Sequence, residues 1–389
     1  MRKVYLDHNA TTPLHPEVLK SISAFLEEDF GNPSSLHQFG RKVRAKMEDA
    51  REQVASLMNA DPSEIVFTSG GSEANNLAIK GMVFGNGNNG SKGHIIASAV
   101  EHPAVLSTCG YLEKKGISVS YVPVDKYGLV SPERVAEEIK EDTILISIQH
   151  SNNEIGTIEP ISEIVEVAKK RGVPVHSDAV QSFGKVPVDV KALGVDMLSV
   201  SAHKLNGPKG VGALFVSRGC KKLTPLIHGG GHEKKRRAGT ENTSGIIGFG
   251  KACEIAEKSM EKHAVQLKEL RDRLERDIQK KIPQVRLNGH PEKRLPTTLN
   301  MSFDCVEGES LLINLDLAGI AISTGSACSS GSLSPSHVLL ALGIPDELVH
   351  GSLRFCFGLG NEERDIDYVM EHLPAIVQRI REMSPLWDD

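Results

Sequence analysis

The sequence predicts an α/β fold with a mainly parallel β-sheet in a large domain, followed by a second, smaller domain. The length of 389 residues exceeds what one hydrophobic core usually serves. Short β-branched runs alternate with helical stretches, which is typical of a parallel sheet covered by helices. After about residue 260 the pattern changes to an amphipathic helix that opens the second domain, in which Leu267, Leu270, Leu274 and Ile278 recur at helical spacing.

The first two β-branched runs lead into residues with useful chemistry. The run EIVFTSG (64–70) is followed by Gly71 and Ser72, and the run HIIASAVEH (94–102) ends at His102. Both runs are predicted as strands because Ile, Val, Phe and Thr are enriched in strands. Each strand therefore gives way to a loop that carries small or polar groups.

Four further runs continue this pattern. They are TILISIQHSNNE (143–154), VPVHSDAVQ (173–181), DMLSVSAHK (196–204) and VGALFVS (211–217). The first three end in polar residues, namely Asn152 and Asn153, Asp178 and Gln181, and Ser201, His203 and Lys204. Because ligands of open α/β sheets bind beyond the carboxyl ends of the strands, these side chains are predicted to share one site.

The composition narrows the class of partner. Lys and Arg number 45 against 50 Asp and Glu, a net charge of −5, which offers no long-range attraction to nucleic acid or to an anionic membrane. The N-terminus has no apolar signal region, and no run of about 18 apolar residues occurs. We therefore predict a soluble, cytoplasmic protein that binds a small molecule or a protein, and neither nucleic acid nor a membrane.

The six cysteines indicate free thiols rather than disulfides or a zinc site, since no CxxC pair occurs. Cys328 stands apart because it lies in STGSACSSGSLSPSH (323–337), a Gly- and Ser-rich stretch that predicts a loop. A buried cysteine that serves as a small hydrophobe is the more common alternative. His228 and His232 lack an evident third ligand, so no metal site is predicted.

The motif FTSGGSEANN is a candidate phosphate site. It combines a strand, a turn of small residues with a hydroxyl, and a helical pattern that begins near Glu73. The amides and the positive end of such a helix suit a phosphate group. An ordinary capped helix start has a similar sequence, so the motif alone leaves both interpretations open.

Lys204 and Asp178 complete a pattern that suits pyridoxal 5'-phosphate (PLP). A lysine at a strand end, beside Ser201 and His203, can lose solvation and form a Schiff base, although most lysines are solvated surface charges. Asp178 precedes it by about one βα unit and would hold a pyridine nitrogen protonated. The phosphate turn, the amine and the carboxylate together predict a PLP site.

Nine motifs in order give the chain a resemblance to a known family. They are YLDHNATTP, GNPSSLHQFGR, FTSGGSEANN, EHPAV, NNEIGT, HSDAVQSFGK, SAHKLNGPKG, HGGGHE with RAGT, and STGSACSSGSL. From Tyr5 to about Trp387 the chain resembles the cysteine desulfurases of the class V PLP-dependent aminotransferase family, and it is nearest to the NifS/IscS-like group.

The resemblance implies the PLP-dependent transferase fold of the aspartate aminotransferase type I class. The large PLP-binding α/β domain would comprise residues 14–260. A smaller α+β domain would comprise residues 1–13 and 261–389 and would carry the catalytic cysteine loop, at about 323–335.

The resemblance also implies a role for each cofactor residue. Lys204 matches the lysine that forms the Schiff base, and Asp178 matches the partner of the pyridinium nitrogen. Gln181 matches the partner of the cofactor's phenolic oxygen. His102 matches the histidine that stacks on the ring and takes part in proton transfer.

Further matches concern the phosphate and the substrate. Four residues match the phosphate cup, namely Gly71, Ser72, Ser201 and His203. Thr240 matches a phosphate contact that the other subunit of a homodimer donates. Asn153, beside the cofactor, and Arg354 match the groups that orient the substrate carboxylate.

The implied activity is the conversion of L-cysteine to L-alanine, with the sulfur left on Cys328 as a persulfide. An acceptor protein, such as an iron–sulfur cluster scaffold, would then take the sulfur, and Cys328 is a candidate transient ligand of a cluster. A nitrogenase maturation system or a tRNA-thiolation relay remains an open alternative as acceptor. A selenocysteine lyase, a class V aminotransferase or a non-catalytic sulfur carrier are the alternative functions.

Overall fold

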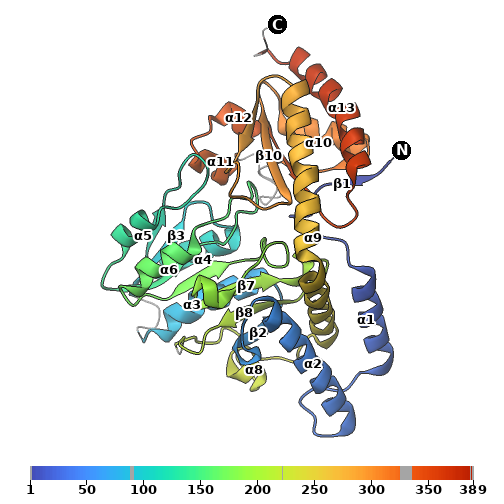
Figure 1. Cartoon of the computed structure of the whole chain (residues 1–389). Helices are drawn as coiled ribbons and strands as arrows, with labels where there is room; N and C mark the ends of the chain where they lie inside the picture. The colour runs from blue at the N-terminus through green and yellow to red at the C-terminus, as the bar shows by residue number, and fades with distance from the viewer. Residues whose placement is uncertain (1, 88–91, 221, 325–334, 386, 388–389) are drawn as a thin grey trace.

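Helices cover both faces of a central β-sheet, and a smaller unit of helices and strands lies at one end of the molecule (Figure 1). The computed structural model of the chain describes residues 2–87, 92–220, 222–324, 335–385 and 387. Cys328 lies outside these described residues, as does most of the predicted cysteine loop.

The central sheet confirms the predicted mainly parallel architecture. In the described part of the chain its seven strands are β2 (Ile65–Thr68), β3 (His94–Ser98), β4 (Ser118–Val122), β5 (Thr143–Ser147), β6 (Val175–Asp178), β7 (Met197–Ser201) and β8 (Gly212–Val216). Their spatial order is β2-β8-β7-β6-β5-β3-β4. All neighbours from β7 to β4 are parallel, and only β8 runs antiparallel to its two neighbours.

Each of the six predicted runs contains one of these strands, but the strands are shorter than the runs. The run 143–154, for example, forms a strand only over Thr143–Ser147, and its polar end is a loop. Strand β4 was not predicted from the sequence. It lies at the sheet edge and has exposed and half-buried residues, so it lacks the continuous apolar run that marks the buried strands.

Two layers of helices follow from the alternation of side chains along the strands. Ile96 of β3 contributes to a hydrophobic cluster on one face, with α2 (Gln38–Leu57), α5 (Pro132–Glu138), α6 (Ile161–Lys169) and part of α9 (Thr243–Lys281). Ile95 and Ala97 contribute to the cluster on the other face, with α3 (Gly71–Gly85) and α4 (Pro103–Glu113). Helix α1 (Pro16–Glu28) packs on α9. The short elements of three or four residues are η1 (Pro62–Glu64), α7 (Val190–Leu193), η2 (Ala202–Lys204) and α8 (His232–Lys235).

The smaller unit is built on an antiparallel sheet and receives the N-terminus. Its strand order is β12 (Ser323–Thr324), β13 (Ser352–Cys356), β10 (Thr298–Phe303) and β9 (Val285–Asn288). Its helices are α10 (Gly308–Leu317), α11 (His337–Ala341), α12 (Asp346–His350) and α13 (Glu363–Glu382). Strand β1 (Val4–Tyr5) pairs in parallel with β11 (Ile320–Ala321), so the two ends of the chain contribute to the same unit.

Helix α9 spans the central sheet and the smaller unit (Figure 1). The predicted amphipathic helix is its second half, whose Leu270, Leu274 and Ile278 belong to the core of the smaller unit. The helix begins at Thr243, earlier than predicted. Its first half was not recognised in the sequence because it contains glycines, which weaken a helical pattern. Gly250 is required there, since a Cβ atom would lie 2.6 Å from the Cα of Ala50 in α2. The predicted domain boundary near residue 260 falls inside this helix and stays a prediction.

None of the helices in the described ranges combines the length and the apolar character that a membrane span requires.

Candidate active site

A cavity of about 190 Å³ lies at the carboxyl ends of the parallel strands. Nine of the predicted site residues line it, namely Gly71, Ser72, His102, Asn153, Asp178, Gln181, Ser201, His203 and Lys204. They come from loops after five different strands, and the sheet topology alone brings them together.

The N-terminus of α3 forms one wall of this cavity. The helix begins at Gly71, and no side chain caps it, so its first amides are free to bind an anion. Gly70, directly before the helix, has a φ of 153°, which favours glycine. A Cβ atom on Gly71 would lie 2.6 Å from Val180 Cγ2, so only glycine permits this close approach to the loop after β6.

Asp178 ends β6 and is nearly buried at 7% exposure. Its Oδ2 accepts a hydrogen bond from Asn75 Nδ2 at 2.6 Å, and its Oδ1 accepts one from the Val180 amide at 2.9 Å. These two donors fix the orientation of the carboxylate at the cavity wall. A carboxylate held in this way is suited to accept a protonated ring nitrogen.

His102 is the N-cap of α4, and its ring is held by the backbone. Nδ1 accepts a hydrogen bond from the Ala104 amide at 3.0 Å, so the neutral ring carries its proton on Nε2. Burial lowers the pKa of His102, and the charges of Lys204 and His337 act in the same direction, while Asp178 opposes them. The ring therefore presents a neutral imidazole to the cavity.

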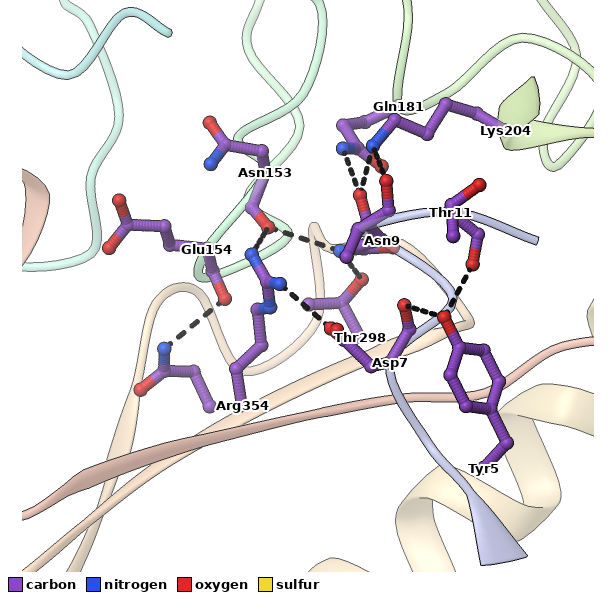
Figure 2. Close-up of polar contacts among 12 residues, drawn as sticks. Tyr5, Asp7, Asn9, Thr11, Asn153, Glu154, Gln181, Lys204, Thr298 and Arg354 are labelled. Atoms are coloured by element: carbon purple, nitrogen blue, oxygen red, sulfur yellow. Dashed lines mark hydrogen bonds and ion pairs between the residues drawn. The ribbon is translucent and has the colours of Figure 1, made fainter. Parts of the chain in front are cut away.

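Lys204 ends the turn that follows β7 and reaches the N-terminal segment. Its Nζ donates to the main-chain oxygen of Ala10 at 2.7 Å and also to that of Asn9 (Figure 2). Next to it, the pKa of His203 is lowered to about 4 by burial and by the charge of Lys204. The cavity thus holds a lysine amine beside a neutral histidine.

Arg354 lies on β13 and is buried, with 1% of its surface exposed. Its guanidinium forms an ion pair with Asp7 at 2.9 Å and donates to the main-chain oxygen of Asn153 at 3.1 Å (Figure 2). The structure therefore places Arg354 against Asn153, although Arg354 does not itself line the cavity.

Besides Arg354, one described residue among those predicted does not line the cavity, and one predicted residue is not described. Thr240 is exposed and is not among the residues that line it. The loop before Thr240 is fixed by ion pairs of Arg51 with Glu233 and of Arg237 with Glu73 in the first turn of α3. Cys328 lies outside the described residues, so its position is not assigned.

Several residues of the site were not predicted from the sequence. Asn75, Gln149, Ser151 and Val180 also line the cavity. Asn75 belongs to the motif FTSGGSEANN and lies one helical turn beyond Gly71, which is the pattern that would have identified it.

Asn9 is the most connected of the missed residues. Its main-chain oxygen accepts hydrogen bonds from Lys204 and Gln181, and its side-chain amide donates to the main-chain oxygen of Asn153 and to Thr298 Oγ1 (Figure 2). The motif YLDHNATTP contains it, but nothing in its local pattern predicts contacts so distant in the chain.

The family model of the class V aminotransferases matches residues 4–369. The chain belongs to this family. Class V aminotransferases use PLP as their cofactor.

Individual relatives narrow the comparison within the class V aminotransferases. The chain is 53% identical over 384 residues to "Cysteine desulfurase IscS" of Dictyoglomus turgidum, and the match covers 99% of this chain and 97% of the relative. Among solved structures, a "NifS-like protein" has a TM-score of 0.91 and 38% identity, and the match covers 97% of this chain and 100% of that one. A structure titled "SspA in complex with cysteine" has a TM-score of 0.81 and 40% identity, covering 92% and 99% of the two chains.

The residues of the cavity fit PLP, the cofactor of the class V aminotransferases. The uncapped N-terminus of α3 offers amides to a phosphate, the fixed carboxylate of Asp178 suits a ring nitrogen, and Lys204 supplies a primary amine. In the part of the chain that the structure describes, no group of three or more His, Cys, Asp or Glu side chains is arranged to hold a metal ion.

Proposed function

We propose that the protein is a cysteine desulfurase that converts L-cysteine to L-alanine and transfers the sulfur to Cys328 as a persulfide. One observation carries this proposal. Lys204 and Asp178 line the same cavity, and Arg354 contacts Asn153, which also lines it. The relatives named cysteine desulfurase support L-cysteine as the substrate.

PLP, when bound, supplies an electron sink that stabilises negative charge on the substrate Cα. The amine Nζ of Lys204 lines the cavity and removes the proton from this carbon as the base. The neutral His102 carries a proton on Nε2, which it can donate to the substrate or product. The first amides of α3 would bind the phosphate group of PLP, and Gln181 would bind its phenolic oxygen.

Arg354 and Asn153 hold the substrate carboxylate. A guanidinium binds a carboxylate through parallel hydrogen bonds, and the ion pair with Asp7 keeps the Arg354 side chain in place. Arg354 lies on β13 of the smaller unit and Asn153 in the loop after β5 of the central sheet, so the carboxylate bridges the two units. This fixes the orientation of the substrate Cα relative to Lys204.

Cys328 accepts the sulfur. Its thiolate attacks the substrate sulfur, an S–S bond forms, and the C–S bond of the substrate breaks as alanine takes up protons and leaves. The sum is one L-cysteine and one thiol converted to one L-alanine and one persulfide. An acceptor protein, such as an iron–sulfur cluster scaffold, then takes the terminal sulfur in the cytoplasm.

We also propose that the protein acts as a homodimer. Thr240 is exposed outside the cavity of its own chain, as expected of a residue that completes the cavity of a second copy. An apolar surface at the tips of α1 and α2 supports this proposal, since Phe30 is 81% and Leu36 88% exposed beside Phe39. Apolar surface of this kind is normally covered by a partner.

The experiment that tests the function measures alanine released from L-cysteine by the intact protein and by its Cys328→Ala variant under reducing conditions. We expect alanine only from the intact protein. Bound PLP without alanine from either protein would overturn the assignment and favour a class V aminotransferase. A colourless protein that binds no PLP would favour the non-catalytic sulfur carrier, and faster turnover of selenocysteine than of cysteine would favour the lyase.

A further inference from the structure

Lys185 is a lysine near the cavity to which the proposed mechanism gives no role. It lies four residues after Gln181 in the motif HSDAVQSFGK. Its Nζ donates to Gln181 Oε1 at 3.2 Å and to Asn9 Oδ1 at 3.1 Å. Both partners are amide oxygens rather than carboxylates, which is unusual for a lysine in the interior of a protein.

Two cations act on Lys185. Burial and the charge of Lys204 lower the pKa of Lys185 to about 7, and the charge of Arg354 acts in the same direction while Cys356 opposes it. His8 and His203 also interact with Lys185, so these five residues come from three segments of the chain. Such a position costs free energy, so a lysine there calls for a functional reason.

The contacts of Lys185 determine how two side-chain amides point. An ammonium group has only donors, so it selects the carbonyl oxygens of Gln181 and Asn9. The amide nitrogen of Gln181 then donates to the main-chain oxygen of Asn9 at 3.1 Å. The amide nitrogen of Asn9 donates to the main-chain oxygen of Asn153 at 3.1 Å and to Thr298 Oγ1 at 3.0 Å.

These two amides serve the two halves of the site. Gln181 lines the cavity. With its amide nitrogen toward the cavity, Gln181 can donate a hydrogen bond to the phenolic oxygen of PLP. A rotated amide would instead place the Gln181 oxygen against that phenolic oxygen and repel it. Asn9 shares the main-chain oxygen of Asn153 with Arg354 (Figure 2). One ammonium therefore contacts both the cofactor side and the substrate side.

We propose that Lys185 is a positioning residue that fixes the amide orientation of Gln181 toward the cofactor and that of Asn9 toward Asn153 and Arg354. The proposal deepens the proposed function and rests on it for the identity of the substrate. It assigns Lys185 no proton transfer and no contact with the reacting atoms.

The first test uses Lys185→Met, which keeps the length of the side chain but removes its donors. With PLP bound, we expect the pH midpoint of the cofactor's visible absorbance to rise by about one unit, since the donor to the phenolic oxygen is no longer oriented. The dissociation constant of PLP should rise about tenfold. The exposed Lys191→Met variant serves as the matched control and should behave as the intact protein. An unchanged midpoint in Lys185→Met would overturn the proposal.

A double-substitution cycle separates positioning from a simple effect of charge. If Lys185 acts through Gln181, Lys185→Met should shift the midpoint no further in a Gln181→Ala background. An equal shift in both backgrounds would contradict the proposal, because it would mean that Lys185 acts on the cofactor directly by its charge.

Asn9→Ala tests the substrate side and remains informative if Lys185→Met does not fold. We expect a higher KM for L-cysteine with an unchanged absorbance midpoint, because the main-chain oxygen that Gln181 contacts is retained. An unchanged KM would count against the proposal. Absorbance and PLP affinity require no turnover, so a failure of the desulfurase assignment would leave the first two tests valid and is recognised separately by the alanine measurement.

Discussion

The two sides of the candidate site are assembled in different ways. On the strand-end side, His102, Asp178 and Lys204 each follow a strand of one parallel sheet. On the opposite side, Asp7 and Asn9 come from the first residues of the chain, and Arg354 comes from a strand near its end. The first side follows from one rule about parallel sheets, whereas the second depends on contacts between distant segments.

The two sides also differ in the ligand that their side chains suit. The strand-end side carries the groups that suit PLP, and the opposite side carries the groups that suit the substrate carboxylate. Substitutions on the first side should therefore impair the cofactor and the chemistry, and those on the second should impair substrate binding. Five substitutions test this division between the two sides.

The largest effect is expected for Lys204→Ala, on the strand-end side. Removing the amine removes both the covalent attachment of PLP and the base, so alanine formation should fall by about 10³-fold or more. The exposed Lys209→Ala serves as the control. Residual activity above a tenth of normal would mean that another group acts as the base.

Asp178→Asn should lower turnover by about 100-fold, because a neutral amide no longer holds the ring nitrogen protonated. The substitution retains the size of the side chain, and the exposed Asp142→Asn provides a matched control. Turnover of L-cysteine and the absorbance of bound PLP check this prediction. Normal turnover with normal absorbance would exclude the pairing of Asp178 with the ring.

On the opposite side, Arg354→Lys should raise the KM for L-cysteine by about tenfold with a smaller change in kcat, since lysine cannot form the paired hydrogen bonds of a guanidinium. Asp7→Asn should raise KM only a few-fold, because Asp7 holds Arg354 through one ion pair. If these variants lose PLP instead, the division between the two sides is wrong.

How far the site could be predicted follows the same division. Asp178 and Lys204 were found from the sequence because each lies near the carboxyl end of a predicted strand. Asn9 was missed because its role arises from contacts with Gln181, Asn153 and Thr298, which are remote in the chain and leave no local pattern. The start of α9 was missed for a related reason. Gly250 lowers the helix propensity of this segment, but it is needed because α2 approaches the helix closely there.

The smallest effect is expected at Glu101, a buried carboxyl group on the strand-end side. Its Oε1 accepts hydrogen bonds from Ser98 Oγ at 2.6 Å and from the Gln149 amide at 2.9 Å. Burial raises the pKa of Glu101 to about 8. The folded state therefore binds more protons than the unfolded state between about pH 4.5 and pH 8, and the contribution of Glu101 to stability is lost as pH rises through this window.

Glu101→Gln removes this titration. The difference in Tm between this variant and the intact protein should increase by a few degrees from pH 6 to pH 9, because only the intact protein loses the contribution of Glu101. Thermal unfolding of the PLP-bound proteins measures this difference. The exposed Glu137→Gln should show no such trend. A relative Tm that does not change between pH 6 and pH 9 would mean that Glu101 is already charged in the folded protein at neutral pH.

The pairing of β1 with β11 has a consequence for synthesis of the protein. Val4 pairs with Ile320, so β1 waits for its partner while the residues between the two strands are translated. At about 5 to 20 residues per second this delay is roughly 15 to 60 s. Lys204 and the other strand-end groups emerge before Arg354 does. A nascent chain therefore completes the strand-end side of the candidate site first, and the side that carries Arg354 forms only after that residue has emerged.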